Sequence, residues 1–203
     1  AGEECLVNLN LPEDYNIAIA LEEVDDRVFK TKNFDELADS PFIASANLQH
    51  HEFNEKGTTF HLWFQGLFKA NWEKIEKDFR AFAAEQIKFF GDFPTKNYHF
   101  LFQILPTSFY HGVEHSASTV IVLGPSYAVL DEKGRYEDLL GVSSHELFHT
   151  WNVKRIRPIE MWPYDFSKEN YSRLGYLSEG ATTWYGDLML YRSKVFTDAA
   201  FFR

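Results

Sequence analysis

The spacing of apolar residues changes near residue 70 from a strand-like pattern to a helix-like one. Before this point, short apolar stretches such as CLVNLNL, YNIAIAL and TTFHLWFQG lie between turns and predict β-strands, with the acidic stretch NFDELADSPFIAS as a loop among them. After it, Trp72, Ile75, Phe79 and Phe82 recur at intervals of three and four, which predicts a helix that ends at Gly91. The order of the two patterns predicts an α+β chain that begins with β structure.

The rest of the chain alternates strand and helix patterns. YHFLFQIL and GVEHSASTVIVLGPS each predict one strand, YEDLLGVSSHELFHTWN predicts a helix, and EGATTWYGDLMLYRS predicts a final helix that Ser178 could cap. We expect residues 1–65 to form the C-terminal part of an N-terminal β-sandwich-like domain, and residues 66–203 to form the first part of a second domain. The chain begins as if partway through a strand, and its last residues, DAAFFR, contain no signal that ends a helix. We therefore expect the chain to be part of a longer protein.

Charge and composition exclude several classes of function. The formal net charge is −10 and basic residues cluster only at Lys154, Arg155 and Arg157, so no nucleic acid is expected as a partner, because phosphate binding needs many clustered cations. No apolar run approaches the roughly 18 residues that a membrane span requires. The single cysteine, Cys5, excludes an internal disulfide and leaves the compartment open among cytoplasmic, periplasmic and secreted.

The predicted helix after residue 136 carries the motif His145-Glu146-x-x-His149. Positions i and i+4 lie one turn apart on a helix, so both imidazoles can face one point, as a zinc ion requires. Glu146 lies about 100° round the helix, where it could act as a general base on a water molecule. The apolar residues predicted to face the core, away from the histidines, are Leu140, Leu147, Phe148 and Trp151.

A catalytic zinc site needs a third protein ligand, and Glu179 is the candidate. It follows His149 by 30 residues, and no basic residue stands three or four positions from it. A carboxylate among apolar residues is costly unless a cation neutralises it. Spacing alone explains Glu179 equally well as an acidic residue that favours a helix N-terminus. The histidines that fit no ligand spacing, and that we expect to be structural or surface residues, are His50, His51, His61 and His99.

Three stretches in this order, YHGVEHSASTV, HELFHTWNVKRIRP and LSEGATTWYGDLML, resemble the glycyl aminopeptidase family of zinc metallopeptidases. NFDELADSP also resembles the stretch ahead of that family's catalytic domain, so the resemblance runs from about residue 30 to 193. These enzymes are gluzincins with a thermolysin-like zincin catalytic domain, usually preceded by a β domain and followed by a PDZ domain. The resemblance implies that residues 66–203 are the first part of such a domain, with the downstream catalytic and PDZ segments expected in the full-length chain.

The resemblance also assigns roles to individual residues. It implies that zinc is held by His145, His149 and Glu179, and that Glu146 is the general base. It implies that Glu114 binds the free α-amine of a peptide substrate, and that Gly112 lets the peptide approach the strand closely. Without the resemblance, Glu114 and His115 would be interpreted as an exposed polar pair on a strand.

The function that the resemblance implies is a zinc-dependent aminopeptidase that removes N-terminal residues from peptides, with a preference for small residues such as glycine. The alternatives are a non-catalytic peptide-binding module that retains the fold, and a metal-free fold in which the motif is accidental. His111 stands where glycine is expected, Thr183 stands where some gluzincins have a carboxylate, and the oxyanion-stabilising tyrosine is expected beyond residue 203. We therefore expect this chain to hold the metal-binding half of an active site, which need not be active alone.

Overall fold

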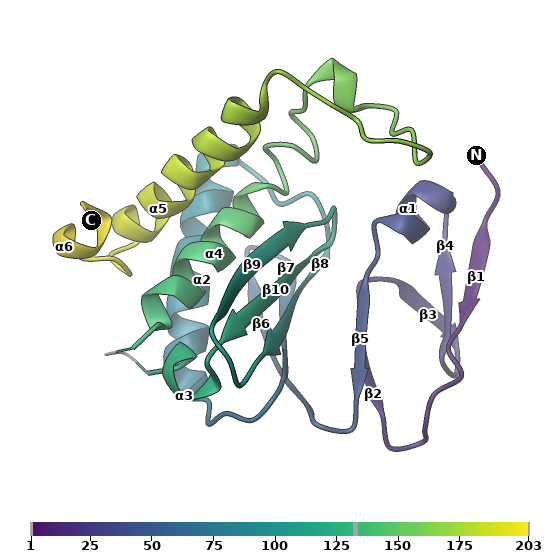
Figure 1. Cartoon of the computed structure of the whole chain (residues 1–203), viewed down its shortest axis with the longest axis horizontal. Coiled ribbons are helices and arrows are strands. Elements are labelled where there is room, and N and C mark those ends of the chain that lie inside the picture. Colours follow the sequence, from purple (N-terminus) through teal and green to yellow (C-terminus); the bar gives the residue numbers. More distant parts are fainter. Residues whose placement is uncertain (1, 132–133, 203) are drawn as a thin grey trace.

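The structure is a computed structural model that describes residues 2–131 and 134–202. It is a mixed α+β fold, as the sequence predicts. A five-stranded sheet is covered by helices on one face, and a smaller group of N-terminal strands lies beyond its other face (Figure 1). The strands β1 to β7 precede the first long helix in the chain, in agreement with the change of apolar pattern near residue 70.

The N-terminal strands form two small sheets. β1 (Cys5–Asn8), β4 (Val28–Thr31) and β3 (Glu22–Asp25) pair in that order, and β2 (Asn16–Ile19) pairs with β5 (Phe42–Ser45). The stretch predicted as an acidic loop instead contains α1 (Phe34–Ala38) and β5, so that prediction is wrong. The Asn33 side chain caps α1 by accepting the Glu36 N–H, and a five-residue helix is too short to show an apolar period.

The five-stranded sheet has the strand order β6 (Leu48–Glu55), β7 (Thr58–Gln65), β8 (Asn97–Ile104), β10 (Ser118–Gly124) and β9 (Phe109–Glu114). β8 is parallel to β7 and to β10, whereas the pairs at the two edges are antiparallel. β9 is therefore an edge strand of this sheet.

The stretch GVEHSASTVIVLGPS was predicted as one strand, and the structure shows that it spans two. β9 ends at Glu114 and β10 begins at Ser118, with a turn between them in which the His115 N–H donates to the Ser118 carbonyl. The alternating part of the stretch belongs to the exposed edge strand, and the continuously apolar part belongs to the buried β10. A change of pattern within one stretch marked a change of strand.

Two helices, α2 (Trp72–Phe90) and α4 (Tyr136–Phe148), cover one face of the sheet, and α5 (Thr182–Arg192) packs against these two helices. α2 has the predicted bounds, because the Asn71 side chain accepts the Lys74 N–H at its start and Gly91 ends it with a φ of 99°. The shorter elements are α3 (Ser126–Val129), a 3-10 turn (Ile159–Met161), a π-helical turn (Tyr176–Ala181) and α6 (Asp198–Phe201).

Aromatic side chains fill the core between the sheet and the helices. Phe64 and Phe102 stack with ring centroids 4.2 Å apart, and Phe79 of α2 meets Phe100 edge to face at 5.2 Å. All four are fully buried, and burying each one contributes about 1.5–3 kcal/mol to stability. The opposite face of the sheet has a smaller apolar contact, in which Leu101 of β8 packs with Ala18 of β2.

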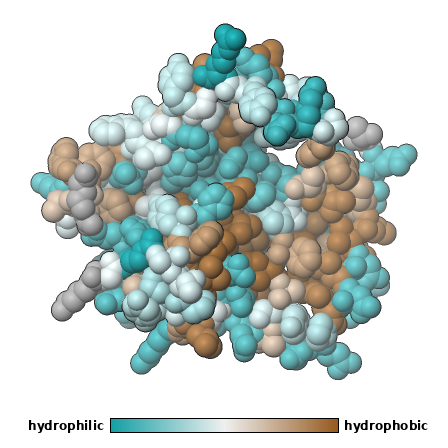
Figure 2. Space-filling model, viewed as in Figure 1, coloured by the Kyte–Doolittle hydropathy of each residue, from teal (hydrophilic) through white to brown (hydrophobic). Residues whose placement is uncertain are grey.

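Hydrophobic residues are also exposed on the surface. Figure 2 shows them over the N-terminal strands and near the centre of the view, and the N-terminal group includes Leu6, Val24 and Phe42 at 66%, 48% and 44% exposure. These residues lie on or beside short strands. No helix in the described ranges has both the length and the apolar content needed to cross a membrane.

The predicted domain boundary between residues 65 and 66 stays a prediction. β6 and β7 precede residue 66, yet β7 pairs with β8 along its whole length. Because this pairing places both strands in the helix-covered sheet, we propose a boundary between β5 and β6 instead.

Candidate metal centre

The motif histidines lie at the C-terminal end of α4, where His145 is in the last turn and His149 follows the last helical residue. The four side chains predicted to face the core are at most 4% exposed, which confirms the orientation of the helix. The histidine side is not open along its whole length, because Ser144 is also buried under α5. At Gly186 of α5 an added Cβ would lie 3.0 Å from the His145 Cα, so the two helices cross closely there.

The structure brings the ligand atoms of His145, His149 and Glu179 together. The two Nε2 atoms are 3.0 Å apart, and Glu179 Oε2 lies 3.4 Å from that of His145 and 3.5 Å from that of His149. Ligands bonded to one zinc ion at about 2.0–2.1 Å in tetrahedral geometry are about 3.3 Å apart. The three atoms could therefore hold one divalent metal ion.

Oxygen atoms on the far side of each ring can accept a hydrogen bond from a protonated Nδ1, which is the tautomer that binds a metal through Nε2. His149 Nδ1 donates to the Asn152 carbonyl at 2.9 Å, and His145 Nδ1 lies 3.3 Å from Thr183 Oγ1. With Nδ1 protonated, each ring directs the lone pair of Nε2 toward the shared point. Oxygen partners of this kind orient metal-binding histidines.

Glu179 comes from the π-helical turn that precedes α5. The prediction that Ser178 caps the final helix is wrong, because the helical turn already begins at Tyr176 and Ser178 is buried inside it. The Ser178 carbonyl accepts the Thr182 hydroxyl at 2.6 Å. The wider turn carries Glu179 toward the histidines, and such turns are frequent at functional sites. Hydrogen bonds with His145 and then His149 hold the pKa of Glu179 well below its usual range, against the effect of burial.

Glu146 is buried beside these atoms, with 4% of its surface exposed. Burial raises its pKa to about 8; nearby His149 lowers it, whereas the negative charges of Glu114 and Glu179 raise it further. Within the described part of the chain, Oε2 of Glu146 has no hydrogen-bond partner. A buried carboxylate oxygen without a partner is costly, and a metal ion with its water would satisfy it. The donor set and this oxygen both fit a bound metal ion.

Gly112 on the edge strand β9 is the point where the sheet meets Glu146. A Cβ at this position would lie 2.1 Å from Glu146 Oε1 and 2.9 Å from its Cγ. Only glycine leaves room for the Glu146 side chain against the strand. This packing role was not foreseen from the sequence, which suggested only a close approach of the substrate.

Glu114, two residues further along β9, also points to the site. Its carboxylate lies within 4.8 Å of ligand atoms of Glu146 and His149. His115 points elsewhere and contacts Asp39 of the N-terminal region, with Nδ1 and Oδ1 3.1 Å apart. The two residues are therefore not one exposed polar pair.

Two residues of the cleft beside His145 and Glu146, Tyr110 and Asp187, were not identified from the sequence as part of the site. Tyr110, Thr183 and Asp187 line it together with His111, Gly141 and Val142. Asp187 follows Glu179 by eight positions, so helical spacing could have revealed it as it did Thr183. Burial raises the pKa of Asp187, an effect that nearby His145 opposes, and burial with neighbouring carboxylates raises that of Tyr110 to about 12.

The basic residues after the motif have partners within the protein. Lys154 Nζ pairs with Asp39 at 3.0 Å, Arg155 donates to the Pro94 carbonyl at 3.2 Å, and Arg157 stacks over Trp162 at 4.5 Å. Lys154 thus pairs with an acidic side chain, whereas Arg155 and Arg157 contact a main-chain carbonyl and an aromatic ring.

Comparisons with known proteins agree with this geometry. The M61 glycyl aminopeptidase family matches residues 138–203, which include the motif and Glu179, and the peptidase M61 N-terminal domain matches residues 1–46. Together the two matches cover more than half of the chain. No curated protein sequence matches it significantly.

Solved structures share the fold over nearly the whole chain. An aminopeptidase N family protein from Idiomarina loihiensis superposes with a TM-score of 0.87 at 26% identity, covering 98% of this chain and 35% of its own. The M1 zinc metallopeptidase of Deinococcus radiodurans, as a mutant bound to a Tyr-Ser-Ala substrate, gives a TM-score of 0.53 at 15% identity, covering 96% of this chain and 40% of its own. This chain thus spans about two fifths or less of the length of these proteins. Two matched regions of one family, in order along a chain with this fold, show that the chain belongs to the M61 glycyl aminopeptidase family.

Proposed function

We propose that this chain carries the metal-binding part of the active site of a zinc-dependent aminopeptidase. The observation that supports this most is the convergence of His145, His149 and Glu179 on one point beside the buried Glu146. Two of the structural relatives, an aminopeptidase N family protein and an M1 zinc metallopeptidase, point to the same chemistry.

The residues divide the work of peptide hydrolysis between them. A zinc ion held by the two histidines and Glu179 would supply Lewis acidity toward the scissile carbonyl and lower the pKa of a water molecule. Glu146 accepts a proton from the attacking water and delivers it to the leaving amine. A pKa near 8 in the metal-free protein suits a group that must both take and release a proton near neutral pH.

Substrate binding is assigned to the edge strand β9. An extended peptide can add to such an edge through main-chain hydrogen bonds. The Glu114 carboxylate then binds the α-ammonium group, which fixes the terminal peptide bond relative to Glu146. We further propose that the preferred substrates have small N-terminal residues such as glycine, as the family name suggests.

The general-base role is tested with Glu146→Gln in the full-length protein. Peptidase activity is expected to fall by roughly 10²–10⁴-fold, because the proton acceptor is lost, while zinc content stays near that of the wild type. Glu13→Gln, an exposed glutamate far from the cleft in sequence, is the matched control. Retained turnover in the Glu146 variant would refute the mechanism, and full-length wild-type protein that binds peptide with zinc but never cuts it would favour the non-catalytic binding module.

The amine-binding role is tested with Glu114→Gln. Cleavage of substrates with a free N-terminus is expected to weaken by about tenfold to a hundredfold, since a hydrogen bond to a charged group contributes about 1.5–3 kcal/mol. N-blocked peptides are expected to be cleaved more slowly by the wild type, and the substitution should change that rate much less. Equal losses on both kinds of substrate would remove the assignment.

A further inference from the structure

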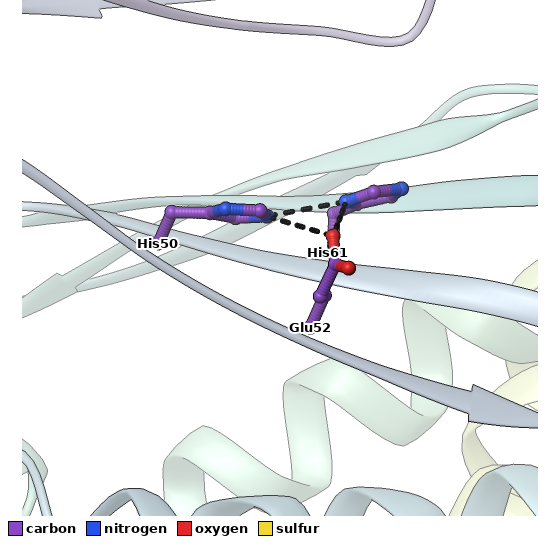
Figure 3. Close-up of side chains that lie close together, drawn as sticks. All are labelled: His50, Glu52 and His61. Atoms are coloured by element: carbon purple, nitrogen blue, oxygen red, sulfur yellow. Dashed lines mark hydrogen bonds and ion pairs between the residues drawn. The ribbon is translucent and has the colours of Figure 1, made fainter.

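A second group of metal-ligand side chains lies on the sheet, outside the cleft. It consists of His50 and Glu52 of β6 and His61 of β7, whose ligand atoms lie within 4.8 Å of one another. Figure 3 shows the three side chains directed toward one another from neighbouring strands. Sequence spacing does not group these three residues, because they lie on two strands that only the hairpin register brings together.

The strand register explains why they meet. His50 and Glu52 are two residues apart on β6 and so share one face of the sheet, and Glu52 stands directly opposite His61. This face is opposite to the helices, since the next residue, His51, instead contacts Glu76 of α2 at 2.7 Å. The group is therefore separate from the candidate active site.

Two of the three distances in this group are close to those of a metal site, and the third is longer than any in the first cluster. His61 Nδ1 lies 3.1 Å from His50 Nε2 and 3.2 Å from Glu52 Oε2, and His50 Nε2 lies 3.9 Å from the same oxygen. Ligands of one tetrahedral zinc ion are about 3.3 Å apart. The Glu52 side chain is exposed, so its carboxylate has room to move closer to His50.

Contacts behind the rings hold them in the ligating state. Asn97 Oδ1 lies 3.4 Å from His61 Nε2, and an oxygen there favours a proton on Nε2 and leaves the Nδ1 lone pair facing Glu52. His50 stacks on Trp63 at 3.8 Å and His61 stacks on His99 at 4.3 Å, which fixes both ring planes.

We infer that His50, Glu52 and His61 form a second binding site for a divalent transition-metal ion such as zinc. Imidazole nitrogen and carboxylate oxygen, without thiolate, suit zinc and its first-row neighbours. A proton on His50 Nε2 can form a hydrogen bond with only one of the other two ligand atoms at a time. A divalent cation would attract all three ligand atoms together. The Glu52 side chain is 57% exposed, so a metal ion could reach the group from solvent.

The test is the zinc content of full-length protein that has been stripped of metal and then equilibrated with zinc. The wild type is expected to bind two zinc ions per chain, His61→Gln one, His149→Gln one and the double variant none. His51→Gln, which removes the adjacent histidine on the other face of β6, is the matched control and should keep two.

The outcomes separate the two sites from each other. If His61→Gln keeps as much zinc as the wild type, the second site is refuted, whatever happens at His149. If His61→Gln loses a zinc ion and His149→Gln does not, the second site stands and the proposed active site fails.

A second variant covers the case in which His61→Gln does not fold, as judged by circular dichroism. Glu52→Gln changes an exposed side chain to one of the same shape and should weaken the second zinc by at least tenfold. With His149→Gln as background, bound cobalt(II) should give visible absorption bands that Glu52→Gln reduces. Bands of unchanged intensity and affinity would overturn the inference.

Discussion

The two histidine–glutamate clusters have the same ligand types on different scaffolds. His145, His149 and Glu179 come from two helices, whereas His50, Glu52 and His61 come from one β-hairpin. The decisive difference is what surrounds them. The helical cluster has a buried carboxylate, a cleft and an edge strand beside it, and the His149 side chain is 2% exposed. The hairpin cluster lies at the surface, with His50 at 32%.

This contrast teaches that a ligand set alone does not define an active site. Both clusters place three ligand atoms at metal-binding distances, but only the helical one has an additional buried base. Its local dielectric is lower, which strengthens the electrostatic interactions that catalysis uses. The predictions below test whether this difference has measurable consequences.

The largest expected effect is the pH dependence of stability in the metal-free protein. Glu146 has a folded-state pKa of about 8, above its ordinary value of 4.5, so its contribution to stability is full below pH 4.5 and is lost as pH rises toward 8. Glu146→Gln, which stays neutral, should therefore be more stable than the wild type at pH 8.5 by on the order of a few kcal/mol, and similar near pH 4.5. Denaturant unfolding at both pH values measures this.

Glu52→Gln is the matched control in that experiment. Its position is exposed, so its variant should follow the wild type at both pH values. An equal pH response of the Glu146 and Glu52 variants would mean that burial does not distinguish the two clusters.

A smaller effect is expected from Gly112→Ala. The new Cβ would overlap the Glu146 carboxylate, and overpacking of this kind costs about 1–3 kcal/mol. Peptidase activity should fall with stability, because the base and the edge strand are displaced together. Gly141→Ala is the contrasting change: its Cβ meets nothing within 4 Å inside α4, so thermal unfolding should show a gain of about 0.5–1 kcal/mol. A tolerated Ala at position 112 would break the proposed link between β9 and Glu146.

The smallest effect concerns the oxygens behind the ligand rings. Thr183→Val removes the oxygen beside His145 Nδ1, and Asn97→Leu removes the one beside His61 Nε2. Loss of such a partner typically weakens metal binding by about 10–100-fold, so each change should affect only its own cluster. Competition with a chromophoric chelator measures both affinities, and Thr183→Ser, which keeps the hydroxyl, should restore the first. No change in either variant would show that the ring tautomers are set in another way.

Most of the fold could be predicted from the sequence where the apolar period is long. The 19-residue helix α2 and the eight-residue strand β8 have strong patterns and both form as predicted. α1 and the turn between β9 and β10 were missed because each involves too few residues to show a period. The predicted cap at Ser178 was wrong because the residue lies inside a π-helical turn that begins at Tyr176.

The sequence by itself determined that His145 and His149 face one point, because a helix places positions i and i+4 on one side whatever surrounds it. It also determined which face of α4 is apolar and therefore buried. Only the tertiary structure decided which residues from other elements join them. Glu179, Gly112 and Glu114 reach the site through helix crossing and strand order, and His50 meets His61 through hairpin register. These contacts join residues distant in sequence, so no local period encodes them, and the packing of the whole core is what brings them together.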